Sequence, residues 1–218
     1  VVVRIKSPQG NYLSGSDPKT GTYFAAAVRP EIPAAQAASS SKDAVFMLDT
    51  SLSSMPDRFP IWLKMLQTTL EKNRDSIKKF AVLFFNIETT WYQNKFIDNN
   101  SDEVARLIAH ANTLSLEGAT DLAQALAEAA KPSWIGQDNT RFDLFLLSDG
   151  APTWGESDLY AISNAIGKGH ALFAYQTGLA GTDIGMLYHL ARESGGAVFS
   201  VVGESEIDSS KGGAPMTN

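Results

Sequence analysis

The sequence predicts an α/β fold with a doubly wound, mostly parallel sheet that is flanked by helices, and a short N-terminal β extension. A continuous apolar run, typical of a strand that is covered on both faces, occurs at 44–48, and largely apolar stretches that we also predict as strands occur at 80–87, 142–147, 171–175 and 198–202. Segments with the spacing or the end signals of helices separate most of these runs. Such alternation is typical of parallel strands, because each parallel pair needs a long crossover connection.

An N-terminal β segment and its connector are predicted over residues 1–42. Strand-like stretches at 1–5 and 22–28 flank a turn region at 14–21 that is rich in Gly, Ser, Asp and Pro. The Pro, Ala and Ser residues at 30–42 leave little to bury, which is typical of a connector. We interpret the segment as the end of a preceding domain.

Five helices are expected in the α/β domain, which we place at 43–203. The first has apolar residues at helical spacing within 61–70, and it is expected to begin near Pro60, since proline is tolerated only in the first turn. The segment 89–92 is predicted to pair antiparallel with the strand at 80–87. The other helices are predicted at 102–116, 120–130, 156–167 and 183–193, with Ser101, Thr120 and Thr182 as N-caps and glycine stops at Gly167 and Gly195.

Composition and charge exclude several classes of function. The net charge of −6 argues against nucleic acid, whose binding depends on Lys and Arg neutralising phosphates. No basic run or long apolar run is present, so membrane insertion is not expected. The absence of cysteine excludes a thiol nucleophile and a zinc–thiolate site. Residues 204–218 have no apolar period and are predicted to be a flexible tail.

Three oxygen-rich loops carry the candidate site. In an open parallel sheet, ligands bind where the strands end at their carboxyl termini. Carboxylates and hydroxyls are hard ligands suited to Mg²⁺, Ca²⁺ or Mn²⁺. Each loop also has a plain interpretation, as a helix cap or as a turn. The candidate ligands are Asp49, Ser51 and Ser53 after the first strand, Thr120 before a helix, and Asp149 after the strand at 142–147.

Taken together, the three loops resemble the von Willebrand factor A (vWA) domain over residues 43–202. The motifs are FMLDTSLSSM, LEGATDLAQAL and FLLSDGAPTWGE, in the order of that family, and LARESGGAVF supports them. They match the family's metal-ion-dependent adhesion site (MIDAS), whose five positions the resemblance assigns to Asp49, Ser51, Ser53, Thr120 and Asp149. GTYFAAAVRPEI, followed by KDAVFMLDTS, also resembles the join between the β-rich (VIT) domain and the A domain in inter-alpha-trypsin-inhibitor heavy-chain-like proteins.

The resemblance implies a non-enzymatic module that binds a protein partner through a divalent cation. Ser51, Ser53 and either Thr120 or Asp149 would coordinate Mg²⁺ (or Ca²⁺ or Mn²⁺), while Asp49 and the remaining residue hold its waters. An open position would then accept an Asp or Glu carboxylate from the partner. The resemblance favours an extracytoplasmic, secreted or cell-surface location. Catalysis is not expected, because the three loops contain no His, Lys or Cys.

Departures from the family pattern leave an alternative open. Leu52 stands where the family usually has glycine, and it would strain or reshape the loop if that glycine serves an unusual backbone conformation. A structural or scaffolding vWA domain with a weak or vestigial metal site is therefore the second hypothesis, and a metal-dependent enzyme is the third. Some relatives switch conformation through a C-terminal helix, and this property is not carried over, because the polar tail shows no helical pattern.

Two residues beside the motifs have two interpretations each. Trp154 is either an aromatic contact for a partner at the rim of the site or a cover for the end of the sheet. Asp121 either supports the metal from behind Thr120 or serves as a first-turn carboxylate that the helix dipole favours.

Overall fold

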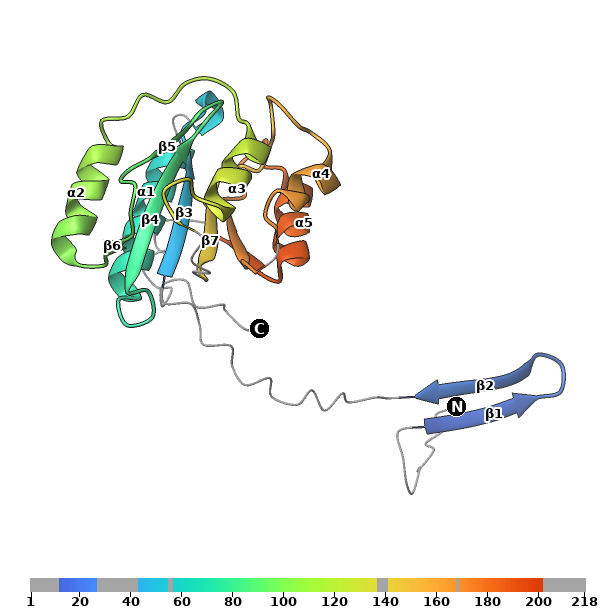
Figure 1. Ribbon diagram of the computed structural model, residues 1–218. Helices are drawn as coiled ribbons and strands as arrows, with labels where there is room; N and C mark the ends of the chain where they lie inside the picture. Colours follow the sequence, from blue (N-terminus) through green and yellow to red (C-terminus); the bar gives the residue numbers. More distant parts are fainter. Residues whose placement is uncertain (1–11, 27–42, 55–56, 137–140, 168, 202–218) are drawn as a thin grey trace. The chain divides into compact units, whose positions relative to one another are not determined.

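A computed structural model describes residues 12–26, 43–54, 57–136, 141–167 and 169–201, which belong to two compact units (Figure 1). The first unit contains a β-hairpin and the second is an α/β unit, and each is described by itself. The predicted strand at 1–5, the connector at 30–42 and the tail at 204–218 lie outside the described residues.

The hairpin consists of β1 (Tyr12–Asp17) and β2 (Gly21–Ala26), which pair antiparallel. The prediction of a turn over 14–21 is therefore wrong for most of that stretch. Its first residues lie in β1, where backbone pairing with β2 overrides their weak preference for strands. The turn itself is shorter, and the Asp17 carboxylate accepts hydrogen bonds there from the backbone N–H groups of Lys19 and Thr20.

The α/β unit has a central seven-stranded sheet with the order β5-β4-β3-β7-β8-β9, and β6 also pairs with β4. The strands from β4 to β9 along this order run parallel, whereas β5 and β6 are antiparallel to β4. This confirms the predicted fold class and the antiparallel neighbour of the second strand. The strands are β3 (Asp43–Asp49), β4 (Lys79–Phe85), β5 (Thr89–Trp91), β6 (Ile97–Asp98), β7 (Asp143–Leu147), β8 (Leu172–Gln176) and β9 (Ala197–Ser200).

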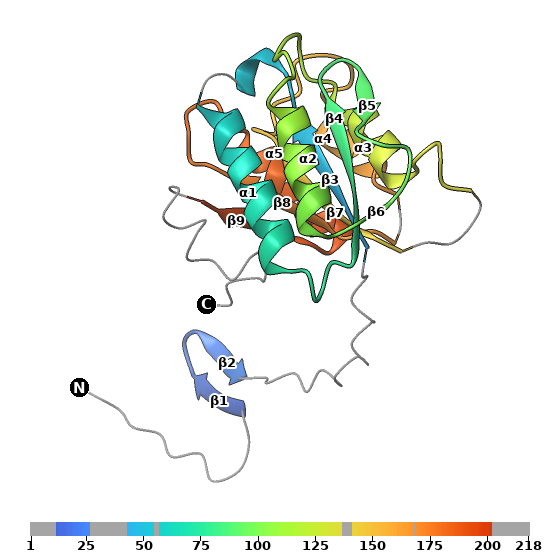
Figure 2. The same cartoon turned by 90° about the vertical axis from the view of Figure 1, so that its left-hand side faces the viewer.

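Helices cover both faces of this sheet (Figures 1 and 2). Side chains alternate along each strand, so that Phe46 and Leu48 pack with α1 and α2, while Val45 and Met47 pack with α3, α4 and α5. Trp62 on α1 is among the largest fully buried side chains. The helices are α1 (Arg58–Lys72), α2 (Ser101–Ala111), α3 (Leu122–Ala130), α4 (Leu159–Asn164) and α5 (Ile184–Ser194). No helix among the described residues is long and apolar enough to cross a bilayer.

The helix starts differ from the sequence prediction in a consistent way. The predicted caps Ser101, Thr120 and Thr182 are wrong, and the N-caps are Asn100, Asp121 and Asp183. Each of these three side chains accepts a hydrogen bond from the backbone N–H three residues later, which is the role that the prediction gave to the neighbouring hydroxyl residue. The predicted stop at Gly195 is confirmed, since it adopts the left-handed conformation with φ 80°.

Three other helix predictions differ from the structure in where the helix begins or ends. The helix predicted to start near Pro60 begins at Arg58, which places the proline in the first turn, where its missing N–H is not needed. The helices predicted at 102–116 and 156–167 are shorter, ending at Ala111 and spanning Leu159–Asn164. A short 3₁₀ turn, η1 (Leu52–Ser54), lies between β3 and α1 and was not predicted.

A candidate metal site at the carboxyl edge of the sheet

The candidate site lies where the strand order reverses. From β3 the chain proceeds to β4 on one side, and it later returns to β7 on the other side of β3. The loop after β3 leads to α1 on one face of the sheet, and the loop after β7 leads to α4 on the opposite face. Diverging loops of this kind open a crevice at the carboxyl ends of the two strands. Asp49 and Asp149 therefore come to the same edge.

The first loop is built around Asp49, whose side chain is completely buried. Its Oδ1 atom accepts a hydrogen bond of 2.9 Å from the backbone N–H of Ser51, and its Oδ2 atom accepts one of 2.7 Å from the hydroxyl of Ser148. Burial raises the pKa of Asp49, while the hydrogen bonds from Ser51 and Ser148 oppose that rise and the charge of Asp149 adds to it. Through these hydrogen bonds, the buried Asp49 side chain fixes the loop that follows β3.

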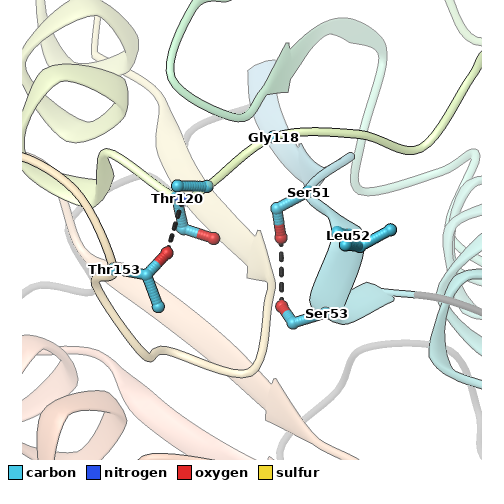
Figure 3. Close-up of a pocket in the computed structure, with 7 residues that line it drawn as sticks. Ser51, Leu52, Ser53, Gly118, Thr120 and Thr153 are labelled. Carbon is cyan, nitrogen blue, oxygen red and sulfur yellow. Dashed lines mark hydrogen bonds between the residues drawn. The ribbon is translucent and has the colours of Figure 1, made fainter.

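The two serines of this loop face each other. The hydroxyl oxygens of Ser51 and Ser53 are 3.0 Å apart, and the 3₁₀ turn that contains Leu52 brings them together (Figure 3). The Ser54 hydroxyl donates to the backbone oxygen of Asp49 at 3.1 Å, which closes the turn. Neither Ser51 nor Ser53 caps α1, whose N-cap position is Asp57. The plain interpretation of these serines as a helix cap is therefore wrong.

The second loop is tied to the first by backbone hydrogen bonds. The N–H of Leu52 donates to the oxygen of Gly118 at 3.0 Å, and the N–H of Glu117 donates to the oxygen of Thr50 at 3.0 Å. The backbone N–H of Thr120 donates to the Thr153 hydroxyl at 2.8 Å, and the Thr120 oxygen accepts from Thr153. These bonds fix Thr120 beside the paired serines.

The Thr120 hydroxyl is the most informative atom of the site. It is buried and has no hydrogen-bond partner, although buried hydroxyls normally have one. It does not cap α3, since Asp121 does so by accepting from Gln124. In Figure 3 it points toward the hydroxyls of Ser51 and Ser53. The interpretation of Thr120 as an N-cap is therefore wrong, and Asp121 is the N-cap itself rather than a first-turn carboxylate.

The third loop follows β7 and carries Asp149, which is buried. Its Oδ1 atom accepts from the N–H of Ala151 at 3.1 Å, so the expected Asp-Gly turn is present. Gly150 has φ 73°, and a Cβ atom there would lie 2.7 Å from Leu187. Glycine suits this position, because the left-handed backbone is strained for other residues and a Cβ atom would crowd the Leu187 side chain. The Asp149 Oδ2 atom lies 3.8 Å from Nη1 of Arg58.

An open hollow of about 480 Å³ lies between these loops. The hydroxyls of Ser51, Ser53 and Thr120 belong to its lining, together with Leu52, Gly118, Ala119 and Thr153 (Figure 3). Asp49 and Asp149 are not among the lining residues. The structure thus gathers all five predicted residues at one edge, with three hydroxyls in the hollow and two buried carboxylates close by. Their roles as ligands stay predictions.

The donor set fits a hard divalent cation. Hydroxyl and carboxylate oxygens suit Mg²⁺, Ca²⁺ or Mn²⁺, whereas zinc sites are usually built from His, Cys and carboxylates. In the part of the chain that the structure describes, no group of three or more His, Cys, Asp or Glu side chains could hold a metal. The five predicted residues contain only two carboxylates, and the buried, unpartnered Thr120 hydroxyl is a donor atom that a cation could satisfy.

Leu52 does not strain the loop. None of the described non-glycine residues has a positive φ, so Leu52 occupies an ordinary backbone conformation. Its side chain points away from the core and is 62% exposed. The expected penalty for a non-glycine residue here is therefore absent, which weakens the hypothesis of a vestigial site.

Four residues that contribute to the site were missed in the sequence. Ser148 and Ser54 bond Asp49, Thr153 bonds Thr120, and Arg58 lies beside Asp149. Adjacency to the motifs was the signal for Ser54, Ser148 and Thr153. Arg58 gave no signal, since an arginine at the start of a helix is ordinarily a surface residue. Trp154 is 62% exposed, which excludes the interpretation that it covers the end of the sheet.

Several solved structures have the same fold. A von Willebrand factor type A protein from Catenulispora acidiphila gives a TM-score of 0.59 at 16% identity and covers 78% of this chain, which spans 41% of that protein. BatB from Bacteroides thetaiotaomicron gives a TM-score of 0.59 at 15% identity over 77% of this chain and 94% of its own. Proximal thread matrix protein 1 from the mussel byssus, in a structure with a zinc-occupied MIDAS motif, gives a TM-score of 0.56 at 17% identity. The match covers 77% of this chain and 45% of that protein.

The α/β unit therefore has the vWA fold, as the sequence motifs predicted. The identities are low, so the likeness concerns the fold, and the VIT-type join stays a prediction. A scan against protein-family models gives no match. A search of curated protein sequences also gives none.

Proposed function

We propose that this chain is a divalent-cation-dependent protein-binding module rather than an enzyme. Ser51, Ser53 and Thr120 or Asp149 would hold Mg²⁺, Ca²⁺ or Mn²⁺, and Asp49 with the remaining residue would orient the waters around it. The bound cation would supply an open coordination position for an Asp or Glu carboxylate of a protein partner. We also propose an extracytoplasmic location, which rests on the family resemblance.

The Thr120 hydroxyl carries this proposal. A buried hydroxyl without a hydrogen bond is unfavourable by about 1–3 kcal/mol. The loop that carries it is fixed by backbone hydrogen bonds, so a bound ligand that satisfies the hydroxyl would explain why it is there. A cation among the three hydroxyls would be such a ligand. Neutral hydroxyl ligands leave a divalent cation more electrophilic than carboxylate ligands do, which favours capture of an external carboxylate.

The first test is metal binding by calorimetry and by crystals soaked in Mn²⁺. Wild-type protein should bind Mn²⁺ between the three loops, and Asp149→Asn should lose binding while its circular dichroism is unchanged. Asp98→Ala is the matched control, since Asp98 is an exposed carboxylate at the other end of β4. Absence of binding at millimolar Mn²⁺ would refute the proposal and favour a structural vWA domain.

The second test addresses the open position. Bound Mn²⁺ with an exchangeable water enhances the relaxation of solvent protons, and acetate that displaces this water should lower the enhancement. No effect of acetate at concentrations up to tens of millimolar would mean that the cation, although bound, does not accept a carboxylate. With a partner in hand, chelator should abolish its binding.

A further inference from the structure

Arg58 connects three loops at the candidate site. Its Nη1 atom donates a hydrogen bond of 2.7 Å to the backbone oxygen of Ser53, and its Nη2 atom donates one to the backbone oxygen of Ala180. The same Nη1 atom lies 3.8 Å from Oδ2 of Asp149. One guanidinium group thus joins the loop after β3, the loop after β7 and the loop between β8 and α5.

This ion pair differs from others in the described part of the chain. The side chains of Arg58 and Asp149 are only 11% and 3% exposed. By contrast, the side chains in the pair of Arg106 with Glu103 are 64% and 22% exposed. Solvent and salt screen an exposed pair strongly and a buried pair weakly. Arg58 therefore places a weakly screened positive charge beside Asp149.

The Arg58–Asp149 contact leaves the carboxylate available. At 3.8 Å the guanidinium compensates the charge without a close hydrogen bond to Oδ2. The two carbonyl oxygens of Ser53 and Ala180 hold Arg58 independently of Asp149. Gly181 follows Ala180, and a Cβ atom there would lie 3.4 Å from Nη2 of Arg58, so the loop packs closely on the guanidinium.

We propose that Arg58 is a tethered cation that holds the metal-free site together and lowers its affinity for the divalent ion. This inference rests on the proposed function. A guanidinium and a metal ion that share one carboxylate repel each other, so the cation binds against the positive charge of Arg58. Without the metal, the same charge stands beside Asp149, whose carboxylate repels that of Asp49. Arg58 is thus a positioning residue that also sets the metal affinity.

Two substitutions separate the charge of Arg58 from its bridging role. Arg58→Gln removes the charge, and it should bind Mn²⁺ about tenfold more tightly than the wild type, the effect of one partly screened charge interaction. Its melting temperature in chelator should fall, and its rise on adding Mn²⁺ should exceed that of the wild type. Arg58→Lys keeps the charge but not the planar fork, so it should lose stability with little change in Mn²⁺ affinity.

The control is Arg106→Gln, which removes an exposed arginine on α2 and should change neither the Mn²⁺ affinity nor the melting temperature in chelator. Mn²⁺ binding by Arg58→Gln that is equal to or weaker than that of the wild type would overturn this inference alone. Absence of Mn²⁺ binding by both proteins would overturn the proposed function as well. If Arg58→Gln is unfolded in chelator, recovery of its circular dichroism in Mn²⁺ supports the inference, and failure to recover contradicts it.

Discussion

The Ser148 hydroxyl donates a hydrogen bond of 2.7 Å to Oδ2 of Asp49, which lies 99 residues earlier in the chain. The same hydroxyl oxygen accepts a hydrogen bond of 3.0 Å from the N–H of Gly150. Ser148 therefore links the carboxyl end of β3 to the loop after β7, and it satisfies one oxygen of a carboxylate that has no contact with solvent.

Ser148→Ala should destabilise the protein and weaken metal binding together. Its loss leaves a buried carboxylate oxygen and a buried N–H unpaired, which we expect to lower the free energy of unfolding by about 1–3 kcal/mol. Urea unfolding in chelator measures this change. The control Ser157→Ala, at an exposed position, should stay within about 0.5 kcal/mol of the wild type. An equal effect of the two substitutions would contradict the linking role of Ser148.

Thr120→Val should weaken Mn²⁺ binding without lowering metal-free stability. Valine has nearly the same shape, and the hydroxyl that it removes has no hydrogen bond to lose. Thr50→Val is the matched control. The Thr50 hydroxyl donates to the oxygen of Phe85 at 3.0 Å, so its loss should lower stability by about 1 kcal/mol and leave Mn²⁺ affinity unchanged.

Calorimetry and urea unfolding on the same two variants separate the effects. If Thr120→Val binds Mn²⁺ as tightly as the wild type, the Thr120 hydroxyl is not a ligand, and the main support for the metal site is lost.

Leu52→Gly should leave Mn²⁺ affinity within about threefold of the wild type, a difference of roughly 0.7 kcal/mol. The reason is that Leu52 is exposed and has an ordinary backbone conformation, so glycine relieves no strain. The measurement is a Mn²⁺ titration of both proteins side by side. A gain of more than tenfold would revive the hypothesis that this leucine makes the site vestigial.

Tyr175 makes the stability of the protein depend on alkaline pH. Burial raises the pKa of Tyr175 to about 12 from 10.0, although the Thr69 hydroxyl favours the phenolate. The folded state therefore binds the phenolic proton more tightly than the unfolded state. The resulting stability is fully present below pH 10 and is lost as pH rises toward 12, by on the order of 2 kcal/mol.

Tyr175→Phe should abolish this part of the pH dependence. Urea unfolding between pH 9 and pH 12 compares it with the wild type and with Tyr188→Phe, whose ring is 52% exposed. Other groups also titrate in this range. The test is therefore the difference between the variants in how the free energy of unfolding changes with pH. A parallel decline of all three proteins would show that Tyr175 ionises freely in the folded state.

The strands were predictable because their burial shows directly in the residue types of each short segment. A strand that is buried on both faces is apolar along most of its length, and β3, β4, β7 and β8 show this in sequence, with charged or amide residues only at their ends. The meeting of the five candidate residues at one edge was predictable for a related reason, while their roles as ligands stay predictions. They lie just beyond strand ends or before a helix, and the parallel sheet brings those points to one edge.

The helix starts were less predictable. At 120–121 and 182–183 a threonine precedes an aspartate, and either can cap a helix. The backbone path decides between them: Thr120 is fixed by Thr153, and the N–H of Asp183 donates to the oxygen of Asp149 at 2.7 Å. These contacts come from distant loops, and no local pattern in the sequence records them.

The sequence by itself determined the fold class and the positions of the three loops, and it predicted a hard-cation site, because burial periodicity and ligand type are properties of short segments. Only the tertiary structure decided that the Thr120 hydroxyl is unpartnered, that Leu52 is unstrained, and that Arg58 lies beside Asp149. Each of these depends on contacts between loops that are far apart in the chain, and such contacts form only when the sheet has assembled.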